Sequence, residues 1–362
     1  MQNCPASAST APGSVCFQQT VRAREQTPRR CHPHQIPLKS LGFPGAESAG
    51  KQFFLGGQAS CGKIAPFPTY TPPETIFIGY DEIFSTRPAS ASTAPGFDFP
   101  YEKWEGRLMK FVTFNLRTDT THDGQNAFFF RAGWVLRKID RELPDVIGFQ
   151  EVRPHMLDFL RKHLPDYTFV GCGRGADFGD EHNPVAFLKE RYELISLDTQ
   201  WLSPTPRIPG SRFEDQSVCP RVVTHVTLRP WNSTRLFRVF NTHLDHVSDS
   251  ARVLGAQAVC RVMEQQQALQ TTPMVLMGDF NAYPGDAPVR IFAENRALGL
   301  TEHTGNIQNS WHDYGRKRDI PRIDYIFSAG FAQKGPAAAW ESGQEGAYLS
   351  DHDPLEVNLE ME

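Results

Sequence analysis

Short apolar runs recur between residues 110 and 361, and they constrain the fold more than any other feature of the sequence. Each has the length and composition of a buried β-strand. Several end in polar residues instead of turn glycines or prolines. Strand ends that meet at one edge of a sheet often form ligand sites, so this pattern predicts such a site. The strand ends in question are Asn115, Gln150-Glu151, Asn241-Thr242-His243 and Asp279-Phe280-Asn281.

Helical patterns separate some of these strands. Apolar residues repeat at helical spacing in residues 127–143, and Pro144 ends the pattern. Further helices are predicted after Pro154 and from Ser248 to about Gln267. Consecutive strands in the middle, with helices before and after them, predict an α+β fold, a four-layer α/β/β/α sandwich.

Residues 1–108 differ in amino-acid composition from the rest of the chain. They contain 13 of the 28 prolines, and the nonapeptide PASASTAPG occurs twice, at residues 5–13 and 88–96. A tract of Ala, Ser and Pro without a periodic apolar face buries too little surface to offset the entropy of ordering it. We expect residues 1–108 to be a low-complexity, mostly disordered extension or the product of a mis-assigned start. Residues 109–362 are then expected to fold and function alone.

Cysteine usage and charge limit the class of protein. The seven cysteines form no CxxC pair, no apolar run is long enough for a membrane span, and no secretory signal is evident. A cytoplasmic protein is therefore expected. Residues 109–362 hold 27 Lys+Arg and 33 Asp+Glu, so composition gives no support to non-specific duplex binding, although nucleic acid is not excluded. The oligomeric state is left open, with a monomer as the expectation.

The sequence GDFN combines an acid and an amide at a strand end. Asp279 and Asn281 alternate around Phe280, so both project from one face while Phe280 points into the core. A carboxylate there can take a proton from water, and the amide can hold that water or a phosphate oxygen. The structural alternative is an Asx turn after a strand.

The sequence NTHLDH nearly matches HxHxDH, a signature of binuclear zinc hydrolases. Asn241 occupies the first histidine position, so one ligand is missing. A zinc site of His243, Asp245 and His246 remains an alternative. In the other interpretation, His243 faces a phosphate and donates a hydrogen bond or a proton.

The sequence SDHDP follows a loop and precedes the last strand. Asp351 and His352 are expected to diverge, so that one binds metal while the other faces the substrate. Asp324 could orient His352 by accepting its ring N–H. Glu151 and Asn115 taken singly are as typical of a helix cap and a turn as of a ligand.

Together these motifs resemble the endonuclease/exonuclease/phosphatase superfamily, over roughly residues 109–361. The resemblance implies a DNase-I-like fold, the same four-layer sandwich, and phosphoester hydrolysis. A middle segment with NP before a strand and WLSPTP after one is similar to an uncharacterised bacterial subgroup near the deadenylase and sphingomyelinase branches. The motifs that support the resemblance are TFNLR, IGFQEV, FNTHLDH, MGDFNA, RIDYIF and SDHDP.

The resemblance also implies residue roles and a Mg²⁺ or Mn²⁺ cofactor, which suits oxygen ligands. Glu151 would be the principal metal ligand, Asp279 would activate water, and His352 would stabilise the phosphoryl oxygens. The implied catalytic residues are His243, Asp279, Asn281, Asp324 and His352. The implied metal ligands are Asn115, Glu151 and Asp351, and the implied substrate-binding residues are Asn183 and Arg221.

The substrate is less constrained than the chemistry. Abasic-site endonucleases have an acid where Arg117 stands, so abasic-site cleavage is disfavoured. The leading hypothesis is hydrolysis of a small or single-stranded phosphodiester. The alternatives within the class are a nuclease, such as a 3'–5' exoribonuclease, and a lipid-headgroup or inositol phosphatase. The alternatives outside it are the zinc hydrolase and a catalytically inactive binding module.

Overall fold

The computed structural model describes residues 106–317, 319–340 and 348–362. The predicted disordered extension, residues 1–108, therefore lies almost entirely outside the described residues. Everything below concerns the described part of the chain, which contains all the residues given a role above.

Two mixed sheets form the centre of this part. In the first the strand order is β11-β13-β1-β2-β4-β3, with β12 beside β13, and in the second it is β5-β6-β7-β8-β10-β9. The first sheet comprises β1 (Leu108–Asn115), β2 (Val146–Gln150), β3 (Tyr167–Val170), β4 (Val185–Leu188), β11 (Phe331–Gln333), β12 (Ala338–Ala339) and β13 (Leu355–Met361). The second comprises β5 (Tyr192–Trp201), β6 (Val222–Pro230), β7 (Phe237–His243), β8 (Met274–Asp279), β9 (Thr301–Glu302) and β10 (Asp324–Ala329).

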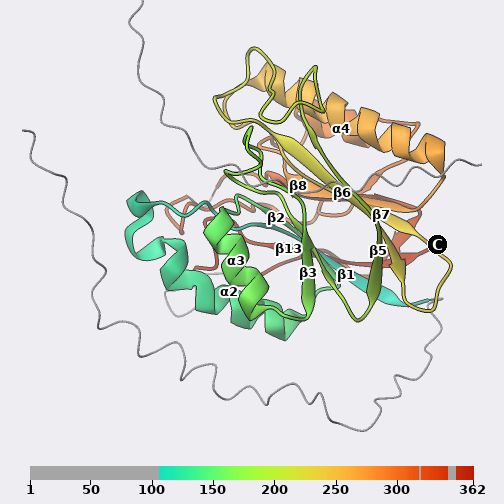
Figure 1. Cartoon of the computed structure of the whole chain (residues 1–362), viewed down its shortest axis with the longest axis horizontal. Coiled ribbons are helices and arrows are strands. Elements are labelled where there is room, and N and C mark those ends of the chain that lie inside the picture. Colours follow the sequence, from blue (N-terminus) through green and yellow to red (C-terminus); the bar gives the residue numbers. More distant parts are fainter. Residues whose placement is uncertain (1–105, 318, 341–347) are drawn as a thin grey trace, which may run out of the picture. The chain divides into compact units, whose positions relative to one another are not determined.

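Helices cover the outer face of each sheet. In Figure 1, α2 (Phe128–Glu142) and α3 (Pro154–His163) lie on the side of the first sheet, and α4 (Asp249–Leu269) lies along the second. A short helix, α5 (Ala287–Ala293), packs with α4, and a 3-10 helix, η2 (Thr121–Asn126), precedes α2. The predicted four-layer α/β/β/α sandwich is confirmed.

Local sequence signals set the helix boundaries. Ser248 caps α4 by accepting a hydrogen bond from the backbone N–H of Ala251. Leu143 ends α2 in the left-handed conformation, directly before Pro144. In the described residues, no helix is both long and apolar enough to cross a membrane.

The two sheets pack closely near the ends of β2 and β7. A Cβ added to Gly148 in β2 would lie 2.6 Å from the sulfur of Met277 in β8 and 2.9 Å from Asn241 Cγ, so a larger residue would have to displace these side chains. The buried amide of Asn241 links the sheets, donating to the carbonyl oxygens of Phe149 at 2.7 Å and Pro184 at 3.0 Å. These contacts fix the strand ends of one sheet against those of the other.

Gly278 in β8 is a position where the fold requires glycine. Its φ is +151°, and a Cβ there would lie 1.9 Å from the carbonyl oxygen of Thr242 on the paired strand β7. Because that oxygen belongs to the sheet backbone, Gly278→Ala should lower the free energy of unfolding by about 3 kcal/mol or more. Urea unfolding measures the loss.

Gly285→Ala is the matched control for this prediction. Gly285 has a φ of +87°, but nothing lies within 4 Å of an added Cβ. We expect Gly285→Ala to lower the free energy of unfolding only by the cost of alanine in the left-handed conformation, about 1 kcal/mol. Equal losses in the two variants would show that the close approach in β8 is not what requires glycine.

Candidate active site

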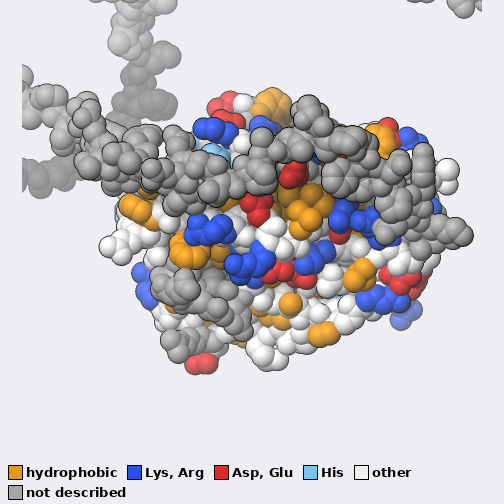
Figure 2. Space-filling view, turned by 90° about the horizontal axis from the view of Figure 1, so that it is seen from below, with side chains coloured by type: hydrophobic (Ala, Val, Ile, Leu, Met, Phe, Trp, Pro, Cys, Tyr) orange, Lys and Arg blue, Asp and Glu red, His pale blue; other side chains and the backbone are white. Residues whose placement is uncertain are grey.

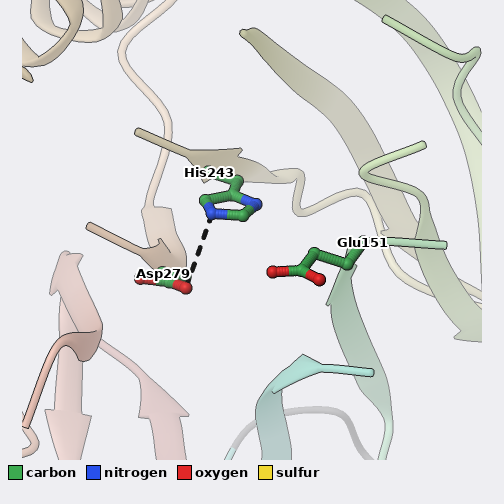
Figure 3. A group of neighbouring side chains, drawn as sticks. All are labelled: Glu151, His243 and Asp279. Atoms are coloured by element: carbon green, nitrogen blue, oxygen red, sulfur yellow. Dashed lines mark ion pairs between the residues drawn. The ribbon is translucent and has the colours of Figure 1, made fainter. Parts of the chain in front are cut away.

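Four strands bring polar residues to one edge of the sandwich. Asn115 ends β1, His243 ends β7 and Asp279 ends β8, while Glu151 follows the last residue of β2. Because β1 pairs with β2 and β7 with β8 in parallel, their carboxyl ends lie side by side. Figure 3 shows Glu151, His243 and Asp279 converging from these strands.

Asn115 connects the two carboxylates of this group. Its side-chain nitrogen donates to Glu151 Oε1 at 3.0 Å and to Asp279 Oδ2 at 2.9 Å. Its oxygen accepts from the backbone N–H of Arg117 at 2.9 Å, and Thr118 N–H donates to Glu151 Oε2 at 2.8 Å. Glu151 has a φ of 62°, a conformation uncommon for a residue other than glycine, and such strain clusters at functional sites.

Asp279 lies between two histidines. Its Oδ2 is 3.5 Å from His243 Nε2 and 3.8 Å from His352 Nε2 (Figure 3 shows the first pair). Burial raises the pKa of Asp279, and the nearby charge of Asp324 raises it further, to about 7. A carboxyl group with this pKa exchanges a proton near neutral pH.

His352 is held by Asp324, as the sequence predicted. His352 Nδ1 lies 2.8 Å from Asp324 Oδ2, which also accepts a hydrogen bond from Ser310 at 2.6 Å. Burial alone would lower the pKa of His352, but the charges of Asp324, Asp351 and Asp279 outweigh it and raise the pKa to about 10. His352 is therefore a cation at neutral pH, with Nε2 directed at Asp279.

Asn281 and His243 form the other side of the site. Asn281, at a φ of 47°, places its side-chain nitrogen 3.0 Å from His243 Nε2 and donates to Leu244 O at 3.1 Å. Burial and the charges of two arginines hold the pKa of His243 well below its usual value, so its ring is neutral. Phe280, between the two polar residues, is fully buried in the core, as predicted.

Asp351 contacts other residues than His352 does, and among the described residues it belongs to neither group of possible metal ligands. Its Oδ2 accepts from Trp311 Nε1 at 3.3 Å and lies 3.9 Å from Arg117 Nε. These contacts do not favour the predicted metal role of Asp351, which stays a prediction.

The two predicted substrate-binding residues are both buried. Asn183 donates to the carbonyl oxygen of Val222 at 3.3 Å, which ties the loop before β4 to the start of β6. With its amide reversed, it would accept instead from the His243 backbone N–H. Arg221, 4% exposed, donates to His246 Nδ1 at 2.8 Å. Substrate contact by either residue is untested.

The NTHLDH stretch does not assemble the alternative zinc site among the described residues. Asn241 is committed to the contacts between the sheets. Asp245 accepts hydrogen bonds from Ser217 and from two backbone N–H groups that follow it, and His246 Nδ1 faces a guanidinium. Such a ring nitrogen cannot simultaneously bind a cation.

Two groups in the described residues do bring ligand atoms close enough for a metal ion. In each group the ligand atoms all lie within 4.8 Å of one another. The groups are Glu151, His243 and Asp279, and Asp279, Asp324 and His352.

Sequence reasoning missed several residues that shape the site. Ser310 fixes Asp324, and Trp311 contacts Asp351. Both lie in a loop without apolar periodicity, so no local pattern marks them. Gln150 was noted only as a strand end, yet its side chain donates to Asn241 Oδ1 at 2.7 Å across the sheets.

Comparison with known proteins agrees with this architecture. A protein from Bacteroides vulgatus described as an endonuclease/exonuclease/phosphatase superimposes with a TM-score of 0.66 at 28% identity, over 71% of this chain and 100% of that one. A mannosyl-6-phosphatase from Bacteroides thetaiotaomicron gives 0.63 at 24%, over 69% and 99%. The human Nocturnin catalytic domain gives 0.56 at 19%, over 70% and 95%. At these identities the last two show the fold alone.

Sequence comparisons give one further result. Curated protein sequences yield no match to this chain. In contrast, the sequence model of the Endonuclease/Exonuclease/phosphatase family matches residues 112–352, which include every strand end that forms the site. The chain therefore belongs to the endonuclease/exonuclease/phosphatase family.

Proposed function

We propose that this protein is a divalent-cation-dependent phosphoester hydrolase in which water attacks phosphorus. One observation supports this most strongly: the Asp279 carboxylate lies between His243 and His352, with the Glu151 carboxylate beside it. Hydrolysis of a phosphoester needs an aligned water, a proton acceptor and neutralisation of the developing negative charge. This group contains candidates for each task.

The residues fit a divalent cation. Half-buried Glu151 and buried Asp279 come together, and the groups that hydrogen-bond them are amide and backbone N–H donors. Two neighbouring carboxylates repel each other, and a cation between them would relieve that repulsion. Carboxylate oxygens suit Mg²⁺ or Mn²⁺.

Glu151 is proposed as the principal ligand of the cation. Asn115 directs its nitrogen, not its oxygen, at the carboxylates, so it is better placed to orient Glu151 and Asp279 than to bind metal itself. When bound, a divalent cation withdraws negative charge from the phosphoryl oxygens.

The chain's own residues would then perform the proton transfer and the alignment. The attacking water forms its bond to phosphorus as its proton passes to the Asp279 carboxylate and the bond to the leaving oxygen breaks. His352, a cation fixed by Asp324, would donate its Nε2–H to a phosphoryl oxygen. Asn281 would hold a second oxygen in exchange for its contact with neutral His243, which positions it.

Surface charge bears on the substrate. Figure 2 views the described part from below Figure 1 and shows acidic side chains interspersed with basic ones on that face. The sequence has a basic run at Arg316-Lys317-Arg318, and two of its residues already have partners. Arg316 pairs with Asp313, and the ammonium of Lys317 lies 4.3 Å from the ring centre of Trp311. These features favour a small or single-stranded substrate over a long duplex.

A substrate panel tests the proposal. It should include bis-p-nitrophenyl phosphate, single-stranded RNA, DNA, phosphatidyl headgroups and inositol phosphates, each with Mg²⁺, Mn²⁺ or a chelator. Metal-dependent release of product from at least one phosphoester is the expected result. Turnover of nucleic acid alone would identify a nuclease, and no turnover of any phosphoester would favour an inactive binding module.

A further inference from the structure

His246 lies at the edge of the site and has no part in the chemistry proposed above. It follows His243 by three residues, where the chain leaves β7, and its ring is exposed whereas that of His243 is buried. Arg221, at the start of β6, donates from Nη2 to His246 Nδ1 at 2.8 Å. The buried guanidinium of Arg221 therefore fixes the ring of His246 at Nδ1.

This contact determines which ring nitrogen of His246 holds the proton. A guanidinium has only donors, so Nδ1 of His246 must be the acceptor and must be unprotonated. The single ring proton is then on Nε2, the nitrogen that Arg221 does not contact. Burial and the charge of Arg221 lower the pKa of His246, in agreement with a neutral ring at physiological pH.

Arg221 has an unusual environment for a buried cation. Its Nε has no hydrogen-bond partner among the described residues. The one carboxylate within 4 Å of it among the described residues, that of Asp245 at 3.9 Å, already accepts from Ser217 and two backbone N–H groups. The charge of Glu181 also acts on Arg221, from a greater distance. A buried charge this weakly paired is costly, and a nearby anion would stabilise it.

The same positive charge acts on the active site. The charge of Arg221 lowers the pKa of His243, and the charge of Glu151 affects His246 in turn. His246 follows His243 by three residues, Asn281 of the site donates to the intervening Leu244 carbonyl oxygen, and His246 is exposed whereas His243 is buried. A donor polarised by a cation behind it binds an acceptor more strongly than a neutral donor alone.

We propose that His246, positioned by Arg221, donates its Nε2–H to a second oxyanion of the substrate, one carried by the leaving group. This inference rests on the proposed function and narrows its substrate class to phosphoesters that have a further phosphate or carboxylate near the scissile phosphorus. His246 is then a specificity-determining residue and Arg221 a positioning residue.

Matched substrate pairs test this inference. The pairs are fructose 6-phosphate with fructose 1,6-bisphosphate, and adenosine 5'-monophosphate with adenosine 3',5'-bisphosphate. Wild-type protein should prefer the bisphosphate in at least one pair by kcat/KM. His246→Phe should reduce that preference about 10-fold or more, the usual effect of losing a hydrogen bond to a charged group. His246→Gln, which keeps an N–H donor, should retain most of it.

Val247→Ala is the control, since Val247 is the exposed neighbour of His246 and has no polar side-chain atom. It should keep the wild-type preference. Equal preference in wild-type and His246→Phe, or a wild-type protein that hydrolyses both members of each pair equally, would overturn the inference. Failure of wild-type to hydrolyse any phosphoester would instead count against the proposed function.

A measurement independent of turnover checks the positioning step. ¹⁵N NMR of the imidazoles should show His246 with a protonated Nε2 and a bare Nδ1. Arg221→Met should convert it to a mixture of tautomers, because the donor that selects one is gone. A protonated Nδ1 in the wild-type protein would contradict the arrangement.

Discussion

Asp279→Asn should lower kcat by roughly 10²- to 10⁴-fold, the usual contribution of a general base. The variant keeps the shape of the side chain but cannot take the proton of the attacking water. Stability should change little, because losing the buried negative charge offsets losing the hydrogen bond from Asn115. Steady-state kinetics at saturating metal, with the melting temperature measured in parallel, separates the two effects.

Asp286→Asn is a suitable control for this variant. Asp286 lies seven residues further on and is exposed, and its carboxylate accepts a local hydrogen bond from the Tyr283 backbone N–H. Its turnover should stay within about twofold of wild-type, as surface changes usually do. Wild-type kcat in Asp279→Asn would remove Asp279 from the proposed role and leave the proton acceptor unassigned.

Removal of divalent cations should abolish activity, and Mg²⁺ or Mn²⁺ should restore it. The reason is the pair of carboxylates, half-buried Glu151 and buried Asp279, which repel a phosphate unless a cation reverses the local field. Glu151→Gln should raise the metal concentration needed for half-maximal activity by roughly 100-fold, since even loss of an outer-sphere partner costs 10- to 100-fold. Activity titrations after treatment with EDTA measure both effects.

The zinc alternative makes the opposite prediction. If Zn²⁺ alone restored turnover and His246→Ala abolished it, the site would be the one suggested by HLDH. The contacts of Asp245 and His246 weigh against this outcome, because both side chains already bond donors of the protein. For the variant Glu151→Gln, the control is Glu264→Gln, which removes an exposed carboxylate on α4 and should leave the metal requirement unchanged.

The parts of the fold that sequence predicted are those with strong local patterns. The predicted helix before Pro144 matches α2, and the predicted helix from Ser248 matches α4. Both residues set a helix end through local geometry, since proline cannot continue a helix and serine caps the first turn. The short strands β3, β9, β11 and β12 were not predicted. With two to four residues each, they are defined by their partners in the sheet and not by their own periodicity.

For the site, as for the fold, local sequence patterns predicted some residues and missed others. Strand ends pointed to Glu151, His243 and Asp279, and the structure brings them together. The contact between His352 and Asp324 was predicted from the sequence and is present, although their catalytic roles stay predictions.

The missed contacts join residues far apart in the chain. The bond between Arg221 and His246 spans 25 residues, and that between Gln150 and Asn241 spans 91 and crosses between the sheets. Such contacts depend on how strands are registered and how sheets face each other. No periodicity within a short segment specifies either.

Isotope transfer from water tests the central claim most directly. The phosphoester that the protein hydrolyses fastest should be turned over once in water enriched in ¹⁸O, and both products should be analysed by mass spectrometry. Water attack on phosphorus predicts one ¹⁸O atom in the phosphate-containing product and none in the alcohol. Label in the alcohol would place the attack on carbon and contradict the account.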